Sequence, residues 1–454
     1  MKNNYMHQLY MGTVGDTKTL EQHFTRMAEQ GWMIEKIGLF THRYRAVEPC
    51  KKCFFVDLLP QITAFDYPEN EDAQDYRSIC EESGWDFIAA NKQLHVFCAD
   101  GENPAPMPIH TDNAIQAKIY LKACRKYELP WLLYALFMFW FSSPIGKGVE
   151  LFLSNISLFM AIGYCFFLIG FIWTFGFVLR WYMRTRKSAK NDMPLPKVNY
   201  NLSKLRNKVF LVGIVVFLVC MITGIVLEIV GGMSLIILPM MLIPISAVGV
   251  GFWVRRQIDT KRRTRAANIG FFIIVIVVME LVLLGAMGVV VNGIISSPLH
   301  SDSLDNRPVL TLNDVGITDA PSSYNTRIKG TVAVPVDYEH WEINQQGSTR
   351  TQVYRSISST LTRRLYDHCA EGLANDFDAI RSTTQEVIIF TSEEAAFWGA
   401  EEGMAQFYTG SNAAELLLMN GKTILRLTIE GEDMSLETVS QAVQKLWGDA
   451  FQTQ

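Results

Sequence analysis

Long uninterrupted apolar runs dominate the middle third of the chain and predict its architecture. A helix needs about 20 apolar residues to cross roughly 30 Å of hydrocarbon, and five segments approach or exceed that length. They lack the alternation of barrel strands, so helices are the structure that satisfies their backbone in lipid. The pattern therefore predicts a five-helix transmembrane bundle over residues 129–295. The predicted spans are about 129–145, 151–179, 209–230, 234–254 and 269–291.

Basic residues concentrate in two of the loops between these spans and predict their orientation. Nine Lys or Arg residues lie within 180–208 and six within 255–265, whereas the other two loops contain only Lys147. Loops rich in Lys and Arg remain in the cytoplasm. Because the number of spans is odd, we expect residues 1–128 to lie in the cytoplasm and residues 331–454 outside the cell membrane.

Composition divides the chain into the same three parts. With 49% hydrophobic and 19% charged residues, the whole is neither a disordered chain nor a disulfide-rich miniprotein. Lys and Arg number 14 against 18 Asp and Glu over residues 1–128, 16 against 5 over 129–297, and 11 against 22 over 298–454. A basic middle between two acidic ends predicts a membrane segment, in contact with the lipid bilayer, between two soluble domains. The outer domain has only Cys369, which forms no disulfide within that domain and favours a bacterial plasma membrane.

Two similar units alternate strand and helix patterns along the first hundred residues. Each predicted helix is followed by Gly-Trp, and glycine is the preferred residue just beyond a helix end. We expect Trp32 and Trp85 to fill the core between helix and sheet. The tandem β-α-β-β units predict one pseudo-symmetric sheet with both helices on one face. The predicted elements are strand 5–12, helix 17–30 and strands 33–39 and 42–47, then strand 53–59, helix 71–83 and strands 86–90 and 93–98.

These units resemble a known bacterial family, the domain of unknown function 2812. Its members share a helix with Gly-Trp, paired strands with an Asp, and a second helix with Gly-Trp. The resemblance covers about residues 5–100, and is carried by residues 20–32, Tyr44-Arg45, Phe54-Phe55-Val56-Asp57 and residues 76–85. It implies a cytoplasmic module ahead of membrane helices in Gram-positive bacteria, often encoded beside PadR-type transcriptional regulators. It implies no enzymatic activity and no cofactor.

The chain beyond the last span predicts a linker and an extracytoplasmic α+β domain. Residues 296–330 are rich in Ser, Pro, Asp and Asn, as expected of a linker. Asn420-Gly421 predicts a tight hairpin with a type I′ preference. Within the domain, 331–454, the predicted strands are 331–338, 352–358, 386–391, 415–419 and 423–429, and the predicted helices are 361–374, 394–407 and 435–446.

Cys50 and Cys53 form the most prominent short motif. Their spacing suits two thiolates of a zinc site or a redox pair. A structural zinc site needs four ligands, however, and the sequence offers neither a second C-x-x-C nor an H-x₃₋₅-H. The pair also lies between two predicted strands, where an ordinary turn is favoured. We therefore predict no metal site, with these two cysteines as the only weak candidates.

Glu280 is the intramembrane polar candidate, near the middle of the fifth predicted span. A carboxylate at that depth is costly, so it must face the bundle interior, be protonated or have a partner. One interpretation is a proton or ion relay. The other is a protonated side chain that donates one interhelical hydrogen bond, with Thr174, Thr223 and Ser246 as candidate acceptors, or one that meets a second subunit.

The layout predicts a non-enzymatic multi-pass membrane protein. The motifs H-E-x-x-H and G-x-S-x-G are missing from residues 331–454, and the acidic cytoplasmic domain argues against nucleic acid as a partner. We expect a signalling or regulatory protein that couples an extracytoplasmic ligand to a cytoplasmic protein partner. A transporter or transport-accessory subunit that uses Glu280, and a membrane enzyme with an unrecognised site, are the alternatives. The sequence leaves the ligand, the partner and homo-oligomer formation open.

Overall fold

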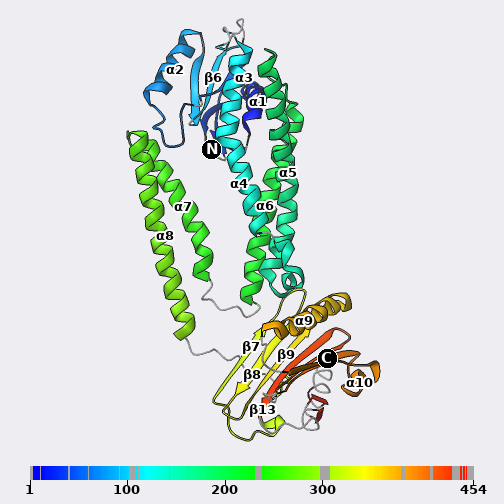
Figure 1. Cartoon of the computed structure of the whole chain (residues 1–454). Coiled ribbons are helices and arrows are strands. Elements are labelled where there is room, and N and C mark those ends of the chain that lie inside the picture. Colours follow the sequence, from blue (N-terminus) through cyan, green and yellow to red (C-terminus); the bar gives the residue numbers. More distant parts are fainter. Residues whose placement is uncertain are drawn as a thin grey trace. The chain divides into compact units, whose positions relative to one another are not determined.

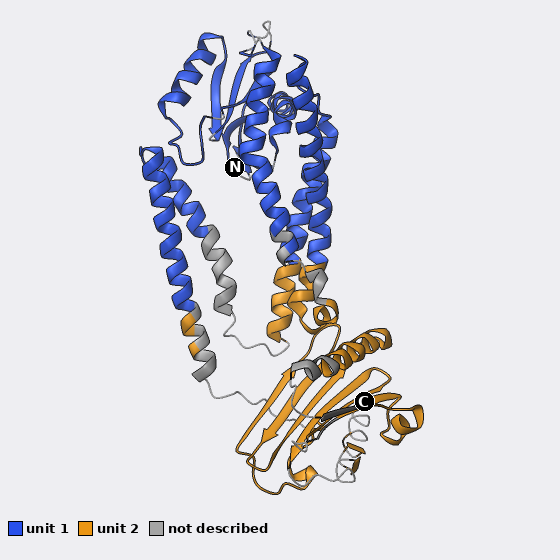
Figure 2. Ribbon diagram, in the orientation of Figure 1, with its two compact units in different colours: residues 1–143, 162–219, 239–287 blue, residues 144–161, 220–238, 288–454 orange. Residues whose placement is uncertain are grey.

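The computed structural model divides into two compact units that are described separately (Figure 2). The first unit comprises residues 1–143, 162–219 and 239–287, and the second unit comprises residues 144–161, 220–238 and 288–454. The residues that the structure describes are 4–10, 12–38, 41–59, 61–91, 93–101, 106, 109–110, 112–142, 144–230, 238–296, 307–379, 384–409, 413–431, 440–441, 443–444 and 446.

The first unit begins with two β-α-β-β repeats, as the sequence predicts (Figure 1). We call β1 to β6 with their helices the N-terminal domain. The first repeat consists of β1 (Tyr5–Leu9), a short 3₁₀ turn η1 (Val14–Asp16), α1 (Thr17–Glu29), β2 (Trp32–Ile37) and β3 (Thr41–Ala46). The second repeat consists of β4 (Lys52–Leu58), α2 (Glu71–Glu82), β5 (Asp86–Asn91) and β6 (Leu94–Asp100).

The repeats form two antiparallel sheets of three strands, so the prediction of one shared sheet was wrong. The strand orders are β1-β3-β2 and β4-β6-β5. Strands β2 and β5 are edge strands that lie near each other, and each has a bulge, at Glu35 and at Ile88. A bulge interrupts the ladder and twists the strand, which prevents continuous pairing between the two edges. Side chains join the repeats instead, since α1 packs against β4.

The Gly-Trp pairs have equivalent positions in the two repeats. Gly31 and Gly84 follow their helices with φ angles of +84° and +88°, which a glycine adopts at little cost. Trp85 is buried and packs on Phe55, with ring centroids 5.3 Å apart. Trp32 is half-buried and packs against the core around α1. Both indoles therefore contribute to packing in this structure.

A helix overlaps each of the five predicted spans. These helices are α4 (Leu129–Ser142), α5 (Asn155–Lys190), α6 (Tyr200–Val230), α7 (Leu238–Thr260) and α8 (Arg265–Ser296). Helix α5 begins only at Asn155, however, and residues 234–237 of the fourth span lie outside the described residues. Of the described stretches, three are long and apolar enough to cross a membrane: α5, α6 and Arg265–Ala286 of α8. The shortest, α4, is the end of a longer helical segment that comprises α3 (Asn113–Ala123) and a π-helical turn, η2 (Cys124–Glu128). Most basic residues assigned to the loop before α6 lie instead on α5 and α6.

A seven-stranded antiparallel sheet forms the core of the second unit (Figure 1). Its order is β10-β11-β12-β13-β9-β8-β7. Its strands and helices are β7 (Ser323–Lys329), β8 (Val336–Ile343), β9 (Gly347–Arg355), α9 (Ser359–Ala379), β10 (Thr384–Ile389), α10 (Ser392–Phe397), β11 (Glu402–Thr409), β12 (Ala413–Asn420) and β13 (Thr423–Gly431).

Four details of this unit differ from the sequence prediction. The strand predicted at 331–338 begins only at Val336, as β8. Strand β7 lies in the predicted linker. The predicted helix 394–407 ends early, because Gly399 adopts a φ of +72° after α10, and strand β11 follows. The hairpin after β12 has Gly421 as its first central residue, with φ +57°, and Lys422 as its second, without positive φ. This pattern is that of a type II′ turn and not of type I′. Of the predicted helix 435–446, the first half lies outside the described residues.

Candidate functional site

A cavity of about 480 Å³ lies in the first unit, between the N-terminal domain and helices α4, α5 and α6. This volume is typical of small-molecule sites. Its wall is largely apolar, with Leu20 from α1, Leu132 from α4 and Phe210 from α6 among the lining residues. A few polar groups interrupt the apolar wall, and they decide which ligands the cavity can accept.

Glu128 is the acidic residue of the cavity wall. It is half-buried at the end of η2, and its carboxylate accepts hydrogen bonds from the Val14 backbone N–H and from the Cys124 thiol, 3.5 Å away. No lysine or arginine among the described residues lies within ion-pair distance of it, and Arg206, which is paired with Asp16, lowers its pKa only from further away. Burial, with repulsion from Asp16, raises the pKa of the Glu128 carboxyl to about 7. Near neutral pH the carboxyl therefore exists in both protonation states.

Three further polar atoms of the wall have no hydrogen-bond partner among the described residues: Tyr10 Oη, His42 Nδ1 and Thr174 Oγ1. His42 is 3% exposed and Thr174 8%, and the His42 ring stacks on Tyr10 with centroids 4.9 Å apart. Burial lowers the pKa of His42 to about 4, so its imidazole is neutral at physiological pH. Buried polar atoms usually have partners, and a bound molecule would supply them here.

A buried ion pair fixes the N-terminal domain to α6 beside this cavity. Asp16 of η1 accepts hydrogen bonds from Ser203 and from the Arg206 guanidinium. Thr13 donates from its backbone N–H and its hydroxyl, each at 2.8 Å. Asp16 is 0% exposed and Arg206 2%, and the guanidinium also lies over the Phe177 ring, 3.8 Å from its centroid. The charges are therefore paired and sequestered from water.

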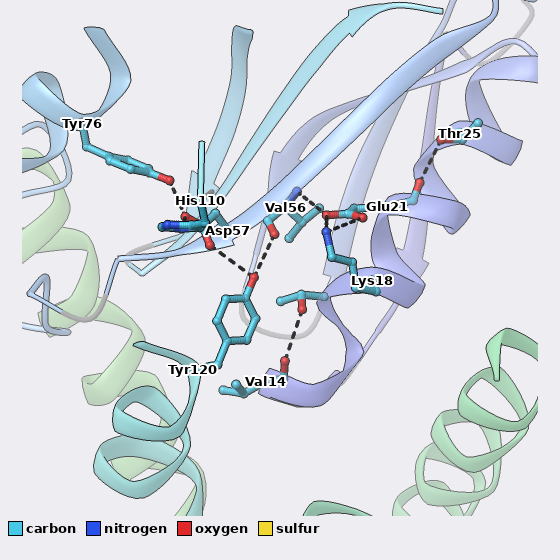
Figure 3. Close-up of polar contacts among 10 residues, drawn as sticks. Val14, Lys18, Glu21, Thr25, Val56, Asp57, Tyr76, His110 and Tyr120 are labelled. Carbon is cyan, nitrogen blue, oxygen red and sulfur yellow. Dashed lines mark hydrogen bonds and ion pairs between the residues drawn. The ribbon is translucent and has the colours of Figure 1, made fainter. Parts of the chain in front are cut away.

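A second buried carboxylate, Asp57 of β4, binds side chains from three other segments (Figure 3). It accepts hydrogen bonds from Tyr76 of α2, from His110 Nε2 at 2.8 Å and from Tyr120 Oη of α3 at 3.2 Å. We call these four residues the Asp57 cluster. Since α3 continues through η2 into α4, the cluster connects the second sheet, β4-β6-β5, to the helix of the first predicted span. All three donors contact one carboxylate, and the Tyr120 hydroxyl also lies 3.3 Å from the Val56 carbonyl oxygen.

The contact between Asp57 and His110 lowers the pKa of the carboxyl and raises the pKa of the imidazole. Burial alone would raise the pKa of Asp57, but the hydrogen bonds and charge of His110, with the Tyr76 hydrogen bond, hold it below its usual range. The hydrogen bond to Asp57 raises the pKa of His110, against the opposing effect of burial. The contribution of His110 to stability is thus fully present below about pH 6.5 and is lost as pH rises through its raised pKa, whereas that of Asp57 is lost only in acid.

We expect Asp57→Asn to lower the pKa of His110 to its ordinary value of about 6.5 or below, because burial then acts without the opposing carboxylate. The measurement is a histidine-detected NMR titration of the full chain in nanodiscs, with the signal assigned by His110→Gln. Asp86→Asn, at an exposed position of β5, is the matched control and should leave the titration unchanged. An unaltered His110 pKa in Asp57→Asn would contradict the pairing.

Helices α7 and α8 are attached to the same domain through polar contacts. Asp66 accepts two hydrogen bonds of 2.8 Å from the Arg265 guanidinium, and Asn268 donates to the Phe65 carbonyl at 2.8 Å. Arg255 of α7 donates to Asn91 at 2.5 Å. Arginines used in the sequence to predict membrane orientation therefore also bind the N-terminal domain.

In the second unit, Glu228 near the end of α6 is buried and connects that helix to the sheet. It accepts hydrogen bonds from the backbone N–H groups of Asn155 and Ile156, at 2.6 and 3.3 Å, where α5 begins. The position suits an anion, because the first N–H groups of a helix lack intrahelical partners. Lys329 of β7 lies 3.4 Å from its other oxygen. The Asn155 side chain accepts from the Val332 N–H at 2.9 Å.

The residues predicted from sequence as site candidates lie away from these contacts. Cys50 and Cys53 are half-buried free thiols, and the described residues contain no group of three or more His, Cys, Asp or Glu placed to hold a metal. Glu280 has an exposed side chain on α8. The suggested hydrogen bond from Glu280 to Thr174 is not formed, since Thr174 Oγ1 has no partner among the residues described. The Ser246 side chain lies outside the described set.

Asp16 and Glu128 were not predicted as site residues. The partners of Asp16 lie about 190 residues further along the chain, and no local spacing relates them. One signal in the sequence could have identified Glu128. It lies directly before a predicted span, where basic residues are expected.

Comparison with known proteins bears on the N-terminal part of the chain. No curated protein matches the sequence. Residues 16–134 match the family described as "Protein of unknown function (DUF2812)", which confirms the resemblance based on the Gly-Trp units. The match continues past the expected end near residue 100, through α3 and η2 into α4. The segment that contains the Asp57 cluster, Asp16 and Glu128 is therefore the DUF2812 segment of this chain.

Proposed function

We propose that the chain is a multi-pass regulatory protein of a bacterial plasma membrane, without enzymatic activity. In this proposal an extracytoplasmic domain responds to a ligand, and the N-terminal domain binds or releases a cytoplasmic protein. The observation that carries the proposal is that α6 forms a buried or partly buried ion pair near each of its two ends. Near its start, Arg206 forms an ion pair with Asp16 of the N-terminal domain. In its last turn, Glu228 forms an ion pair with Lys329 of β7, in the seven-stranded sheet.

A continuous helix with buried polar contacts near both ends is suited to transmit movement. The helical hydrogen bonds of α6 are local, so the helix shifts or rotates as a rigid element. A displacement at Glu228 would change the position of Arg206, whose charge must remain paired because it is buried. Coupling of this kind requires that α6 has two alternative positions, and that the contacts at each of its ends favour one position over the other.

The proposed topology is a five-helix bundle with a cytoplasmic N-terminus and an extracytoplasmic C-terminus. Three of its helices have the required length and apolarity, and the other two complete an odd number of spans. The basic residues around α5, α6, α7 and α8 support a cytoplasmic location for the N-terminal domain, because Arg206, Arg255 and Arg265 all contact it.

The proposal predicts that loss of the Lys329–Glu228 pair alters partner binding by the N-terminal domain. A photo-crosslinking amino acid replaces Ile79, which is 54% exposed on α2, and crosslinked proteins from living cells are identified by mass spectrometry. Lys329→Met should change the yield of the partner crosslink by about two- to fivefold, since a partly exposed pair contributes about 0.5–1 kcal/mol to a two-state balance.

Lys422→Met, at the exposed turn after β12, is the matched control and should leave the yield unchanged. Regulator-type partners whose yield depends on Lys329 would support the proposal. Crosslinks to transport subunits would favour the accessory-subunit alternative. Identical partners and yields in all variants, including one that lacks residues 298–454, would overturn the regulatory coupling.

A further inference from the structure

We infer that the cavity between the N-terminal domain and helices α4, α5 and α6 binds a small lipophilic cation. Among the described residues, the geometry combines an apolar wall of drug-sized volume, one carboxylate without an ion-pair partner, and three polar atoms without hydrogen bonds. A ligand that is mostly apolar and carries one positive charge satisfies all three features. This inference goes beyond the proposed regulatory function and does not depend on it.

The charge preference follows from how the acidic groups near the cavity are paired. Asp16 is neutralised by Arg206, so this carboxylate offers no net charge to a ligand. Among the described residues, Glu128 accepts hydrogen bonds from an N–H and a thiol, neither of which compensates a full charge. Arg206 attracts Glu128 only from further away, because its guanidinium is bound to Asp16. A cation in the cavity would pair with it, whereas an anion would repel it at low effective dielectric.

Aromatic rings in the wall favour the same class of ligand. Tyr10, His42, Tyr127, Trp131 and Phe210 all line the cavity. The faces of Trp, Tyr and Phe rings attract cations, most strongly where water is excluded. The neutral His42 imidazole adds a nitrogen that has no partner among the described residues, and it imposes no opposing positive charge at physiological pH.

The position of Trp131 indicates how a ligand reaches the cavity. This residue lines the cavity and is 53% exposed, so it lies at its outer edge. It follows the start of α4 by two residues, and Trp side chains are enriched where a span meets the membrane surface. In the proposed topology this level belongs to the cytoplasmic leaflet, whose negative charge attracts lipophilic cations. Entry from the inner membrane surface is therefore the expected route.

Tetraphenylphosphonium and tetraphenylborate, which have nearly the same shape and opposite charge, are suitable probes. Equilibrium binding of each radiolabelled ion is measured on the purified full chain in nanodiscs, with empty nanodiscs subtracted. Tetraphenylphosphonium should bind saturably and at least about tenfold more tightly than tetraphenylborate, equivalent to about 1.4 kcal/mol.

The affinity for tetraphenylphosphonium should also rise about tenfold between pH 6 and pH 8. Its charge is independent of pH, whereas a carboxyl with a pKa of about 7 goes from about one tenth to about nine tenths ionised. The groups around Glu128 do not mask this change: Asp16 is held by Arg206, the pKa of Cys124 lies above the usual range because of burial, and His42 titrates near pH 4.

Glu128→Gln keeps an acceptor for the Val14 N–H and removes the charge, so it should abolish the pH dependence and weaken cation binding about tenfold. Glu29→Gln, at an exposed site on α1 outside the cavity, should change neither. Absent saturable binding, equal affinity for the two ions, or a flat pH profile in the unaltered chain would each overturn the inference. All three are measured on the unaltered chain, so they remain decisive even if the Glu128→Gln protein fails to fold. Because the site is independent of the regulatory function, cation binding is expected whether or not the partner crosslinks change.

Discussion

Replacing Arg206 with methionine should destabilise the first unit by about 3–5 kcal/mol, because the substitution leaves Asp16 as a buried carboxylate without its counter-charge. Asp16 is 0% exposed and Arg206 2%, so water cannot replace the guanidinium. Ser203 and Thr13 still donate hydrogen bonds, but neutral donors do not compensate a full charge. Thermal unfolding of the full chain in nanodiscs, with hydrogen exchange of η1, α1 and the start of α6, measures the loss.

The double variant Asp16→Leu with Arg206→Met distinguishes charge from packing. Removal of both charges avoids the unpaired carboxylate, and apolar replacements of buried ion pairs are often neutral or stabilising. We therefore expect the double variant to recover most of the stability that the single variant loses. Lys204→Met, at an exposed site two residues away on α6, should change stability by less than about 0.5 kcal/mol. Equal effects of Arg206→Met and Lys204→Met would show that the pair is not a point of attachment.

Local patterns were sufficient for most elements of the N-terminal domain. Period-two and period-3.6 spacing, with Gly31 and Gly84 as helix ends, predicted the two β-α-β-β repeats. The division into two sheets was not predictable, because the bulges at Glu35 and Ile88 have no signature in composition. The helix expected at 394–407 failed for a related reason: the apolar residues there suit either period, and the conformation of Gly399 decides between them.

The candidate site depends on long-range contacts and was largely inaccessible to sequence reasoning. Arg206 and Arg265 were correctly recognised as part of a charge pattern, but their partners Asp16 and Asp66 lie about 190 and 199 residues away. The cavity is likewise built from segments far apart in sequence. The resemblance to the DUF2812 family located the important segment, including Asp57, although it assigned no role to that residue.

Asp57→Ala should cost the first unit about 3–5 kcal/mol, comparable to the loss of other buried charge pairs. Asp57 is 1% exposed. Its removal takes the carboxylate acceptor from Tyr76 and His110, and leaves Tyr120 with the Val56 carbonyl, 3.3 Å away. Unpaired buried donors each carry a desolvation cost. Because Tyr120 belongs to α3, the largest increase in hydrogen exchange is expected there and in η2, with a smaller increase in β4.

Two variants test the origin of this loss. Tyr120→Phe removes one donor and keeps the carboxylate paired with His110, so it should cost only about 1 kcal/mol. Asp86→Ala, at an exposed position of β5, should change stability by about 0.5 kcal/mol or less. Asp57→Ala should also abolish the part of the pH dependence above pH 6.5 that arises from His110, because the raised pKa of that imidazole depends on the carboxylate. If Asp57→Ala unfolded no more readily than Asp86→Ala, or left exchange in α3 unchanged, the cluster could not be the connection between the second sheet and the first predicted span.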